Sequence, residues 1–365
     1  MRPGISRRTL LAGALMGGTA LRALAGGHAA TGGLLRLIAN ENPYGPSPAA
    51  REAANRAVQA GWKYAMREVT ALKGRIAAHE GVSPAHIMVS AGSTEALRVS
   101  ALAFLRAGGR VLAAQPTFAF FADYARALDC EVDAIPLTAA KAHDLDAMAA
   151  AVKPDTRAVY LCNPNNPTGT RLPIADLEDF IAAVAPRAPV IVDEAYLDLD
   201  PDWPGQTAVA RVRAGDAVIV TRTFSKLHGM AGLRVGYAVA PPAIIDRLEA
   251  LRITQMSYPG VMAAAASLDD EEFINFSRAR IREGVAIVTG VLQALRRPYI
   301  SSYGNFVFFD TGAPAREFMA GMRQRGILTG MPSGSYPTWA RVSVGKVEEM
   351  QAFATAARDY FGGKG

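Results

Sequence analysis

The chain has 365 residues, of which 50% are hydrophobic and 20% charged, so it can form one large domain or two smaller ones around a sizeable core. Its formal net charge of +6 is concentrated at one end: the first 25 residues contain no acid and four arginines, Arg2, Arg7, Arg8 and Arg22. No other run of Lys and Arg with interleaved aromatic residues follows, which argues against a nucleic-acid-binding protein.

The N-terminal stretch "SRRTLLAGALMGGTALRALA" predicts an export signal. Paired arginines, Arg7 and Arg8, precede a short apolar run, and Ala23-Leu24-Ala25 offers a small-residue cleavage site. The arginine pair is typical of twin-arginine export. We therefore expect residues 1–30 to be a signal and short linker, and the protein to be periplasmic or otherwise exported, or cytoplasmic if the signal is not used. Glycines and Arg22 interrupt a run shorter than the about 20 apolar residues of a membrane anchor, so no stable anchor is expected.

Apolar runs alternate with helical patterns over residues 95–240. Helices are predicted at 94–105, 118–128 and 177–185, and buried strands at 110–115, 131–137, 158–164, 189–196, 217–223 and 234–240. This alternation predicts an α/β fold with a large, mostly parallel sheet covered by helices on both faces. In such sheets a ligand binds outside the carboxyl ends of the strands.

The pattern changes after about Leu248. A long helix is predicted from Glu271 to Leu295, followed by a strand at 305–310, a helix, a strand at 340–345 and a final helix from Glu348. This order predicts a smaller C-terminal α/β lobe. We expect domains at 31–60 (an N-terminal segment), 61–250 (the large domain) and 251–365 (the small domain). The five histidines lack metal-ligand spacing, so no metal site is expected. Cys130 and Cys162 could form one disulfide, but the sequence does not require it.

Polar residues gather at the ends of the predicted strands. A small-residue turn, "SAGSTEALR", opens a helix whose free N–H groups suit a phosphate. The proline-locked turn "CNPNNPTG" and the sequence "VDEAY" each follow a buried strand, and a buried carboxylate such as Asp193 requires a cationic partner. Lys226, in "TRTFSK", lies at the end of another strand.

These segments, in this order, resemble the fold-type-I aminotransferases that use pyridoxal 5'-phosphate, and most closely the histidinol-phosphate aminotransferase branch. The resemblance covers most of the chain after Leu37. Besides the segments above it includes "NENPYGPSP", "PTFAFFADYARAL", "SKLHGMAGLRVGY", "NFVFF" and "RVSVG".

The resemblance implies a role for each residue type around the cofactor. Lys226 is expected to form the Schiff base and to shuttle the substrate proton, and Asp193 to pair with the pyridinium nitrogen. Tyr196 and Asn166 are expected to donate to the 3′ oxygen of the ring, and Phe118 to stack on it. The phosphate is expected to be bound by Arg234, whose planar guanidinium suits a dianion, with Ser93, Thr94 and Ser225.

Further residues are expected to bind substrate or a partner subunit. By the same resemblance, Arg341 binds the substrate α-carboxylate, and Asn40 and Tyr44 line the substrate pocket in the N-terminal segment that crosses the active site. Tyr64 is expected to reach the phosphate of a neighbouring subunit, which implies a homodimer with shared active sites. The bonds before Pro116 and Pro167 are expected to be cis, and Asn305 is either a site residue or a turn residue.

The chain departs from the branch at three places. Tyr64 is followed by Ala65-Met66 rather than Pro-Asp, and Thr94 replaces an aspartate. Residues 329–331, Thr-Gly-Met, contain no arginine where the branch has one that helps to bind the substrate phosphate. An unphosphorylated amino donor that carries a carboxylate, with a 2-oxo acid as acceptor, is therefore expected.

Three alternatives to this aminotransferase remain open. One is a decarboxylase or lyase that uses the same cofactor and fold. Another is a true histidinol-phosphate aminotransferase. The third is a non-enzymatic cofactor-binding or regulatory protein, which would not need Arg341 and usually carries a DNA-binding segment.

Overall fold

The structure, a computed structural model, describes residues 33–252, 255–330 and 334–363. The predicted export signal lies outside these residues. Within the described ranges no helix is both long enough and apolar enough to span a membrane.

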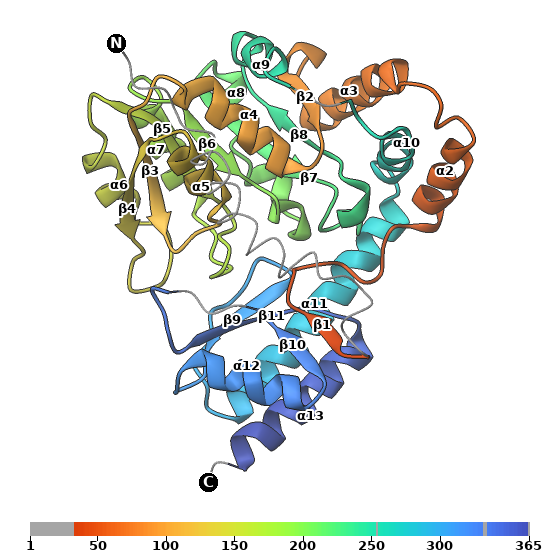
Figure 1. Cartoon of the computed structure of the whole chain (residues 1–365), viewed down its shortest axis with the longest axis vertical. Helices are drawn as coiled ribbons and strands as arrows, with labels where there is room; N and C mark the ends of the chain where they lie inside the picture. Colours follow the sequence, from red (N-terminus) through yellow and green to blue (C-terminus); the bar gives the residue numbers. More distant parts are fainter. Residues whose placement is uncertain (1–32, 253–254, 331–333, 364–365) are drawn as a thin grey trace, which may run out of the picture. The chain divides into compact units, whose positions relative to one another are not determined.

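A seven-stranded sheet forms the centre of the larger part of the fold (Figure 1). Its strands run in the order β2 (Ile87–Ser90), β8 (Gly236–Val239), β7 (Val218–Thr223), β6 (Val190–Asp193), β5 (Thr156–Cys162), β3 (Arg110–Gln115) and β4 (Glu131–Pro136). Only β8 is antiparallel to its neighbours. The predicted mostly parallel sheet is confirmed, although β2 was not expected and β8 was not distinguished from the parallel strands.

Two apolar cores cover the two faces of this sheet, because successive strand side chains point to opposite sides. Leu112, Val159 and Val190 face one core, and Val111, Ala158 and Ile191 face the other. The first core is covered by α3 (Met66–Glu80), α7 (Ile174–Val184), α8 (Val209–Arg213) and α10 (Tyr258–Ser267). The second is covered by α4 (Ser93–Leu105), α5 (Phe120–Ala127) and α9 (Pro242–Glu249).

The C-terminal elements form a second group with its own small sheet (Figure 1). Strands β9 (Phe306–Asp310) and β11 (Trp339–Ser343) pair antiparallel, with Arg341 opposite Phe308. Helices α11 (Glu271–Ala294), α12 (Ala315–Gln324) and α13 (Val347–Gly362) pack on or beside this sheet. Its core contains buried aromatic residues, among them Phe309, Phe318 and Phe353. The predicted small α/β lobe is thus present.

The remaining elements lie within or beside these two groups. They are β1 (Leu35–Leu37), α2 (Pro48–Val58), η1 (Pro84–His86), α6 (Leu145–Ala150), η2 (Leu197–Leu199), η3 (Trp203–Gly205), η4 (Ala231–Leu233) and β10 (Ile327–Thr329). Helix α2 begins where Ser47 accepts a hydrogen bond from the amide of Ala50 and a proline occupies the first turn. It packs against α10.

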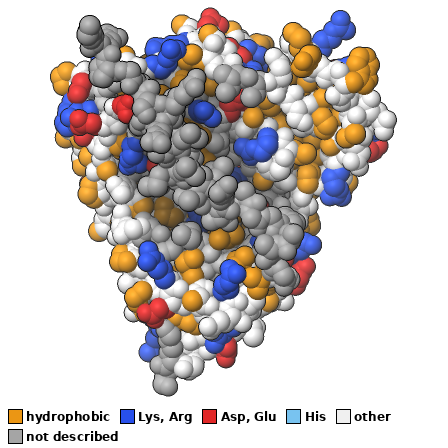
Figure 2. All heavy atoms as spheres, in the orientation of Figure 1, with side chains coloured by type: hydrophobic (Ala, Val, Ile, Leu, Met, Phe, Trp, Pro, Cys, Tyr) orange, Lys and Arg blue, Asp and Glu red, His pale blue; other side chains and the backbone are white. Residues whose placement is uncertain are grey.

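The predicted cis bonds before Pro116 and Pro167 are present, and the bonds before Pro46 and Pro164 are cis as well. Both cysteines are buried and free, so no disulfide forms between them. On the described part of the face in Figure 2, Lys and Arg side chains are spread singly among uncharged ones rather than gathered in one patch.

Candidate active site

Eight of the predicted cofactor residues line one cavity of about 140 Å³ at the carboxyl ends of β5, β6 and β7. The segments that form it are far apart in the sequence, as expected for a parallel sheet. The predicted residues are Ser93, Thr94, Phe118, Asp193, Tyr196, Ser225, Lys226 and Arg234, and the cavity is completed by Cys162, Ala195, Thr223 and Ala231.

Lys226 lies just beyond β7 and points its ammonium group into the site. Its Nζ donates a 2.9 Å hydrogen bond to the backbone oxygen of Asn40 and lies 5.3 Å from the centre of the Tyr196 ring. Burial, and next the charge of Arg341, lower the pKa of Lys226 to about 8. A substantial fraction of this amine is therefore neutral, and so nucleophilic, near neutral pH.

Asp193 is the last residue of β6 and is only 2% exposed. Its Oδ1 accepts a hydrogen bond from the Thr221 hydroxyl at 2.9 Å, and its Oδ2 accepts one from the Tyr160 hydroxyl at 3.3 Å. Burial raises the pKa of Asp193 to about 6, against the effect of these hydrogen bonds and of Lys226. A carboxylate held in this way is poised to pair with one more cationic donor.

Sequence reasoning missed Tyr160 and Thr221. Thr221 is directly opposite Asp193 in the β6–β7 pairing, and Cys162 is opposite Asp193 on the β5 side. Tyr160 is on the same face of β5 as Cys162, two residues earlier. Both are polar residues within predicted buried strands, and this was the signal that could have indicated them. To pair them with Asp193, however, the register of the strands must be known, and the sequence does not give it.

A hydrogen-bond network surrounds the hydroxyl of Tyr196. The hydroxyl oxygen accepts hydrogen bonds from the side-chain amides of Asn40 at 3.0 Å and Asn166 at 3.5 Å. The Ser343 hydroxyl donates to Asn40 Oδ1 at 2.7 Å, and the backbone N–H of Asn40 donates to Ser343 Oγ at 2.8 Å. Burial raises the pKa of Tyr196, so its phenol stays protonated and can donate. The sequence left open whether Asn305 is a site residue or a turn residue. Its side chain is buried and donates a hydrogen bond to the backbone oxygen of Asn40.

Arg341 projects from β11 toward this network. Its Nη1 donates to Asn166 Oδ1 at 2.5 Å, and its Nη2 donates to the Ile38 oxygen at 2.8 Å. Its Nε is buried without a hydrogen-bond partner, and no carboxylate of the described residues lies within ion-pair distance. Burial lowers the pKa of Arg341. An unpaired, desolvated guanidinium next to Asn166 suits a carboxylate of a ligand.

The other end of the cavity is suited to a phosphate. Helix α4 begins after Gly92, and no side chain caps its N-terminus, so its first N–H groups are free to bind an anion. The exposed Arg234 donates from Nη1 to the Ala231 oxygen and from Nη2 to the Ala91 oxygen. Gly92 has φ +80°, and a Cβ there would lie 2.4 Å from Arg234 Nη2. A glycine is therefore required for the arginine to lie across the helix start.

Five predicted residues are not among those that line this cavity: Asn40, Asn166 and Arg341 belong to the network described above, and Tyr44 and Tyr64 lie apart from it. The Tyr44 hydroxyl accepts from the amide of Val347 at the start of α13, and the Tyr44 ring packs edge-on against Phe276. Tyr64 is 78% exposed and makes no contact with the cavity, which is compatible with a role toward a second subunit. Phe118 lines the cavity, with its ring 4.6 Å from that of Phe120.

A seven-stranded, mostly parallel sheet with a lysine, a buried aspartate and an uncapped helix N-terminus at its strand ends defines a fold-type-I aminotransferase. The profile of the family Aminotransferase class I and II matches residues 33–356. The chain therefore belongs to the class I and II aminotransferases, and the predicted fold, enzyme class and pyridoxal 5'-phosphate dependence are confirmed.

Curated relatives confirm the predicted likeness to the histidinol-phosphate aminotransferase branch. The histidinol-phosphate aminotransferase of Moorella thermoacetica is 37% identical over 330 residues, which cover 89% of this chain and 85% of that protein. The protein of the same name from Symbiobacterium thermophilum is 38% identical over 333 residues, covering 90% and 91%.

Two solved structures are similar as well. A putative histidinol-phosphate aminotransferase from Erwinia carotovora atroseptica superposes with a TM-score of 0.87 at 34% identity, covering 90% of this chain and 96% of that one. The histidinol-phosphate aminotransferase of Sinorhizobium meliloti, solved in complex with pyridoxal-5'-phosphate, gives 0.85 at 28% identity, covering 91% and 92%.

Proposed function

We propose that the chain transfers the amino group of a carboxylate-bearing amino acid to a 2-oxo acid, with pyridoxal 5'-phosphate bound between Lys226, Asp193 and the start of α4. The observation that carries the substrate assignment is the unpaired guanidinium of Arg341 beside Asn166. A free α-carboxylate supplies the anion that this guanidinium lacks.

The cavity fits the cofactor at both ends. The buried carboxylate of Asp193 can accept a hydrogen bond from a protonated ring nitrogen, and Phe118 can cover the ring. The α4 N-terminus, Arg234 and the hydroxyls of Ser93 and Ser225 form a phosphate site. When bound, the cofactor supplies an electron-accepting ring that stabilises negative charge at the donor α-carbon.

The residues of the chain then position the donor and move its proton. Arg341 binds the α-carboxylate and so fixes the orientation of the α-carbon. The Nζ of Lys226, with its lowered pKa, would accept the proton of the donor α-carbon and pass it to the cofactor. In the second half-reaction it would move a proton back, to the α-carbon of the 2-oxo acid. Asn166 donates to the Tyr196 hydroxyl, and these two side chains would hold the ring oxygen of the bound cofactor.

A phosphorylated donor is less well matched to this site. Thr329 and Gly330 are placed next to Arg341: Gly330 forms an isolated β-bridge with it, and a Cβ at Gly330 would come within 3.1 Å of Arg341 Nε. Neither residue offers a second cation. The second candidate function is nevertheless histidinol-phosphate transamination, because the relatives at 37–38% identity carry that name.

Steady-state kinetics separate the two candidates. Histidinol phosphate and a panel of α-amino acids are compared as donors with 2-oxoglutarate and with pyruvate. We expect at least one amino acid to have the higher kcat/KM. A value for histidinol phosphate above that of every amino acid tested would assign the chain to the second function.

The chain is also proposed to act as a homodimer. Four exposed apolar side chains lie between the end of α2 and the start of α3, and such clusters mark interaction surfaces. They are Val58, Trp62, Tyr64 and Met66, exposed by 61% to 81%. Light scattering of the wild type tests the dimer, which a monomeric protein would contradict. The cofactor affinity of Tyr64→Ala tests the shared site, which an unchanged affinity would contradict.

Export is proposed on the N-terminal sequence alone. Replacing Arg7 and Arg8 with lysine is expected to retain the folded, cofactor-loaded protein in the cytoplasm, because the twin-arginine route requires the arginine pair. Cell fractionation and immunoblotting measure it, and unchanged export of the double variant would exclude this route.

A further inference from the structure

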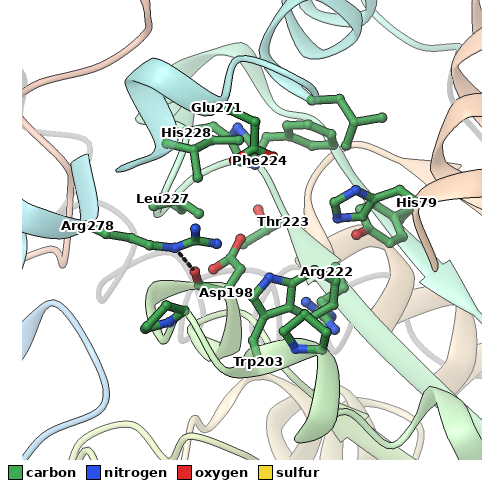
Figure 3. Close-up of a pocket in the computed structure, with 15 residues that line it drawn as sticks. His79, Asp198, Trp203, Arg222, Thr223, Phe224, Leu227, His228, Glu271 and Arg278 are labelled. Carbon is green, nitrogen blue, oxygen red and sulfur yellow. Dashed lines mark hydrogen bonds between the residues drawn. The ribbon is translucent and has the colours of Figure 1, made fainter. Parts of the chain in front are cut away.

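A second cavity, of about 380 Å³, is shown in Figure 3. It shares a wall with the cofactor cavity. Residues 222–228 form that wall. Thr223 lines both cavities, Ser225 and Lys226 line the cofactor cavity, and Phe224 and His228 line the second. The remaining lining residues are His79, Asp198, Pro201, Trp203, Pro204, Arg222, Leu227, Tyr237, Leu268, Glu271, Ile274 and Arg278.

The second cavity contains a carboxylate whose hydrogen-bonding capacity is unused. Figure 3 shows Asp198, from η2, and Arg278, from α11, facing the same space. Arg278 donates from Nε to the backbone oxygen of Asp198 at 2.9 Å, not to its carboxylate. Asp198 Oδ1 is buried and accepts no hydrogen bond from the residues that the structure describes. Because a buried acceptor without a donor is costly, this oxygen favours a ligand that brings one.

The charges around this cavity favour a cation. The guanidinium of Arg222 lies in an ion pair, with its Nη2 3.0 Å from Glu194 and 3.9 Å from Glu80, although its Nε and Nη2 make no hydrogen bond within the described residues. Arg278 is the other guanidinium among the lining residues, which also include the carboxylates of Asp198 and Glu271. Carboxylates therefore outnumber guanidinium groups in and behind the cavity.

The other walls are apolar. Phe224, Leu227, Leu268 and Ile274 are each at least 95% buried and line the cavity. The volume falls in the range of about 300–1,000 Å³ typical of small-molecule sites. An unfilled acceptor in a cavity with apolar walls, with Glu80 and Glu194 behind it adding negative charge, fits an amine attached to an apolar body.

We propose that this second cavity binds a small organic ammonium cation, whose N–H group donates to Asp198 and whose apolar body packs against Phe224, Leu227 and Ile274. The site is distinct from the amino-donor site, and neither its lining nor its ligand depends on the substrate proposed above. Because residues 222–228 also carry Lys226, occupancy of the second cavity alters the surroundings of the reactive lysine, as expected of a regulatory site.

The probe is N,N-dimethylphenethylamine, which is protonated at neutral pH. As a tertiary amine it has one N–H donor but cannot condense with the aldehyde of the cofactor, so it cannot act as a substrate. Titration calorimetry on the cofactor-loaded full chain is expected to show saturable binding of one molecule per chain. Failure to bind at millimolar concentration would overturn the proposal.

Asp198→Asn removes the charge with little change in shape. It is expected to weaken probe binding by at least about tenfold, since a charge-assisted hydrogen bond is lost. Asp202→Asn is the matched control: Asp202 is exposed on the same loop and does not line the cavity, so binding should not change. Equal affinities for the two variants would overturn the proposal.

Three further variants guard against a folding defect and against binding at the wrong site. Glu271→Gln, at an exposed position, should weaken binding up to about fivefold, while Glu272→Gln, its exposed neighbour outside the cavity, should not. Lys226→Ala should retain probe binding, although it cannot attach the cofactor. Loss of binding in Lys226→Ala together with normal binding in Glu271→Gln would place the probe in the cofactor cavity and overturn the proposal.

Discussion

The two ends of the cofactor cavity are built differently. At the ring end, Asp193 is buried and Lys226 is partly buried. Loss of hydration raises the pKa of Asp193 to about 6 and lowers that of Lys226 to about 8. At the phosphate end, the groups are backbone amides of α4, small hydroxyls and the exposed Arg234, which is fixed by backbone carbonyls. We therefore expect the ring end to provide reactivity and the phosphate end to provide affinity.

The largest effect is expected at the ring end, from Lys226→Ala. Loss of both nucleophile and proton carrier should lower kcat by about 10⁴-fold and abolish the absorption band of covalently attached cofactor. Absorbance spectra and steady-state rates measure this. Lys153→Ala, a surface lysine paired with Asp133, should behave as wild type. An unchanged spectrum in Lys226→Ala would exclude the lysine.

Asp193→Asn should retain the cofactor but slow turnover by roughly a hundredfold to a thousandfold, because a buried charge pair is broken. Thr221→Val, which removes only one hydrogen bond to the same carboxylate, should cost about tenfold or less. The two rates are compared at saturating cofactor. Full turnover in Asp193→Asn would mean that this carboxylate serves the structure only.

Arg341→Gln tests the substrate end of the same region. It should lower kcat/KM for carboxylate-bearing donors by about tenfold to a hundredfold, since one charge-assisted contact is lost. Donors that lack the carboxylate should lose little. Arg325→Gln, in a surface ion pair of the same lobe, is the control. Equal losses for donors with and without a carboxylate would contradict the assignment.

Gly92→Ala probes the phosphate end. The added methyl group meets Arg234 Nη2, and φ +80° is unfavourable for alanine. We expect about tenfold weaker cofactor binding, with kcat at saturating cofactor almost unchanged. Gly108→Ala separates strain from the clash, because φ is +75° there but no atom lies within 4 Å. A reduced kcat in Gly92→Ala would contradict the assignment of reactivity to the ring end and of affinity to the phosphate end.

The smallest effect concerns pH. Below pH 8 most Lys226 is protonated, so the rate at which cofactor-free protein takes up pyridoxal 5'-phosphate should rise with pH and level off above about 8. Arg341→Gln removes one of the charges that lower this pKa and should move the midpoint upward. Stopped-flow absorbance measures it. A midpoint that does not move, or moves downward, would contradict this coupling.

The sequence predicted the strand ends well because parallel β/α units repeat a strong pattern. Asn166, Asp193 and Lys226 each follow a buried apolar run, and the order of these runs places their ends at one edge of the sheet. The antiparallel β8 could not be recognised, since a fully buried strand has the same apolar pattern in either direction.

The contacts between segments distant in sequence were less predictable. Tyr160 and Thr221 reach Asp193 only through the strand register. Ser343 and Asn305 contact Asn40 from more than 260 residues away, and no local pattern reports such pairs. Tyr44 illustrates the same difficulty, since it packs against α13 and Phe276 rather than in the cavity.

Asn40 has a consequence for the order in which the molecule is made. Its backbone oxygen accepts from Lys226 and Asn305, and its side chain contacts Tyr196 and Ser343. These partners are synthesised up to 303 residues after Asn40. Asn40 therefore leaves the ribosome long before Ser343 is synthesised. Contacts between residues so distant in sequence form slowly, because a long loop must close first. A nascent chain that stops before residue 343 leaves the lysine without its finished surroundings.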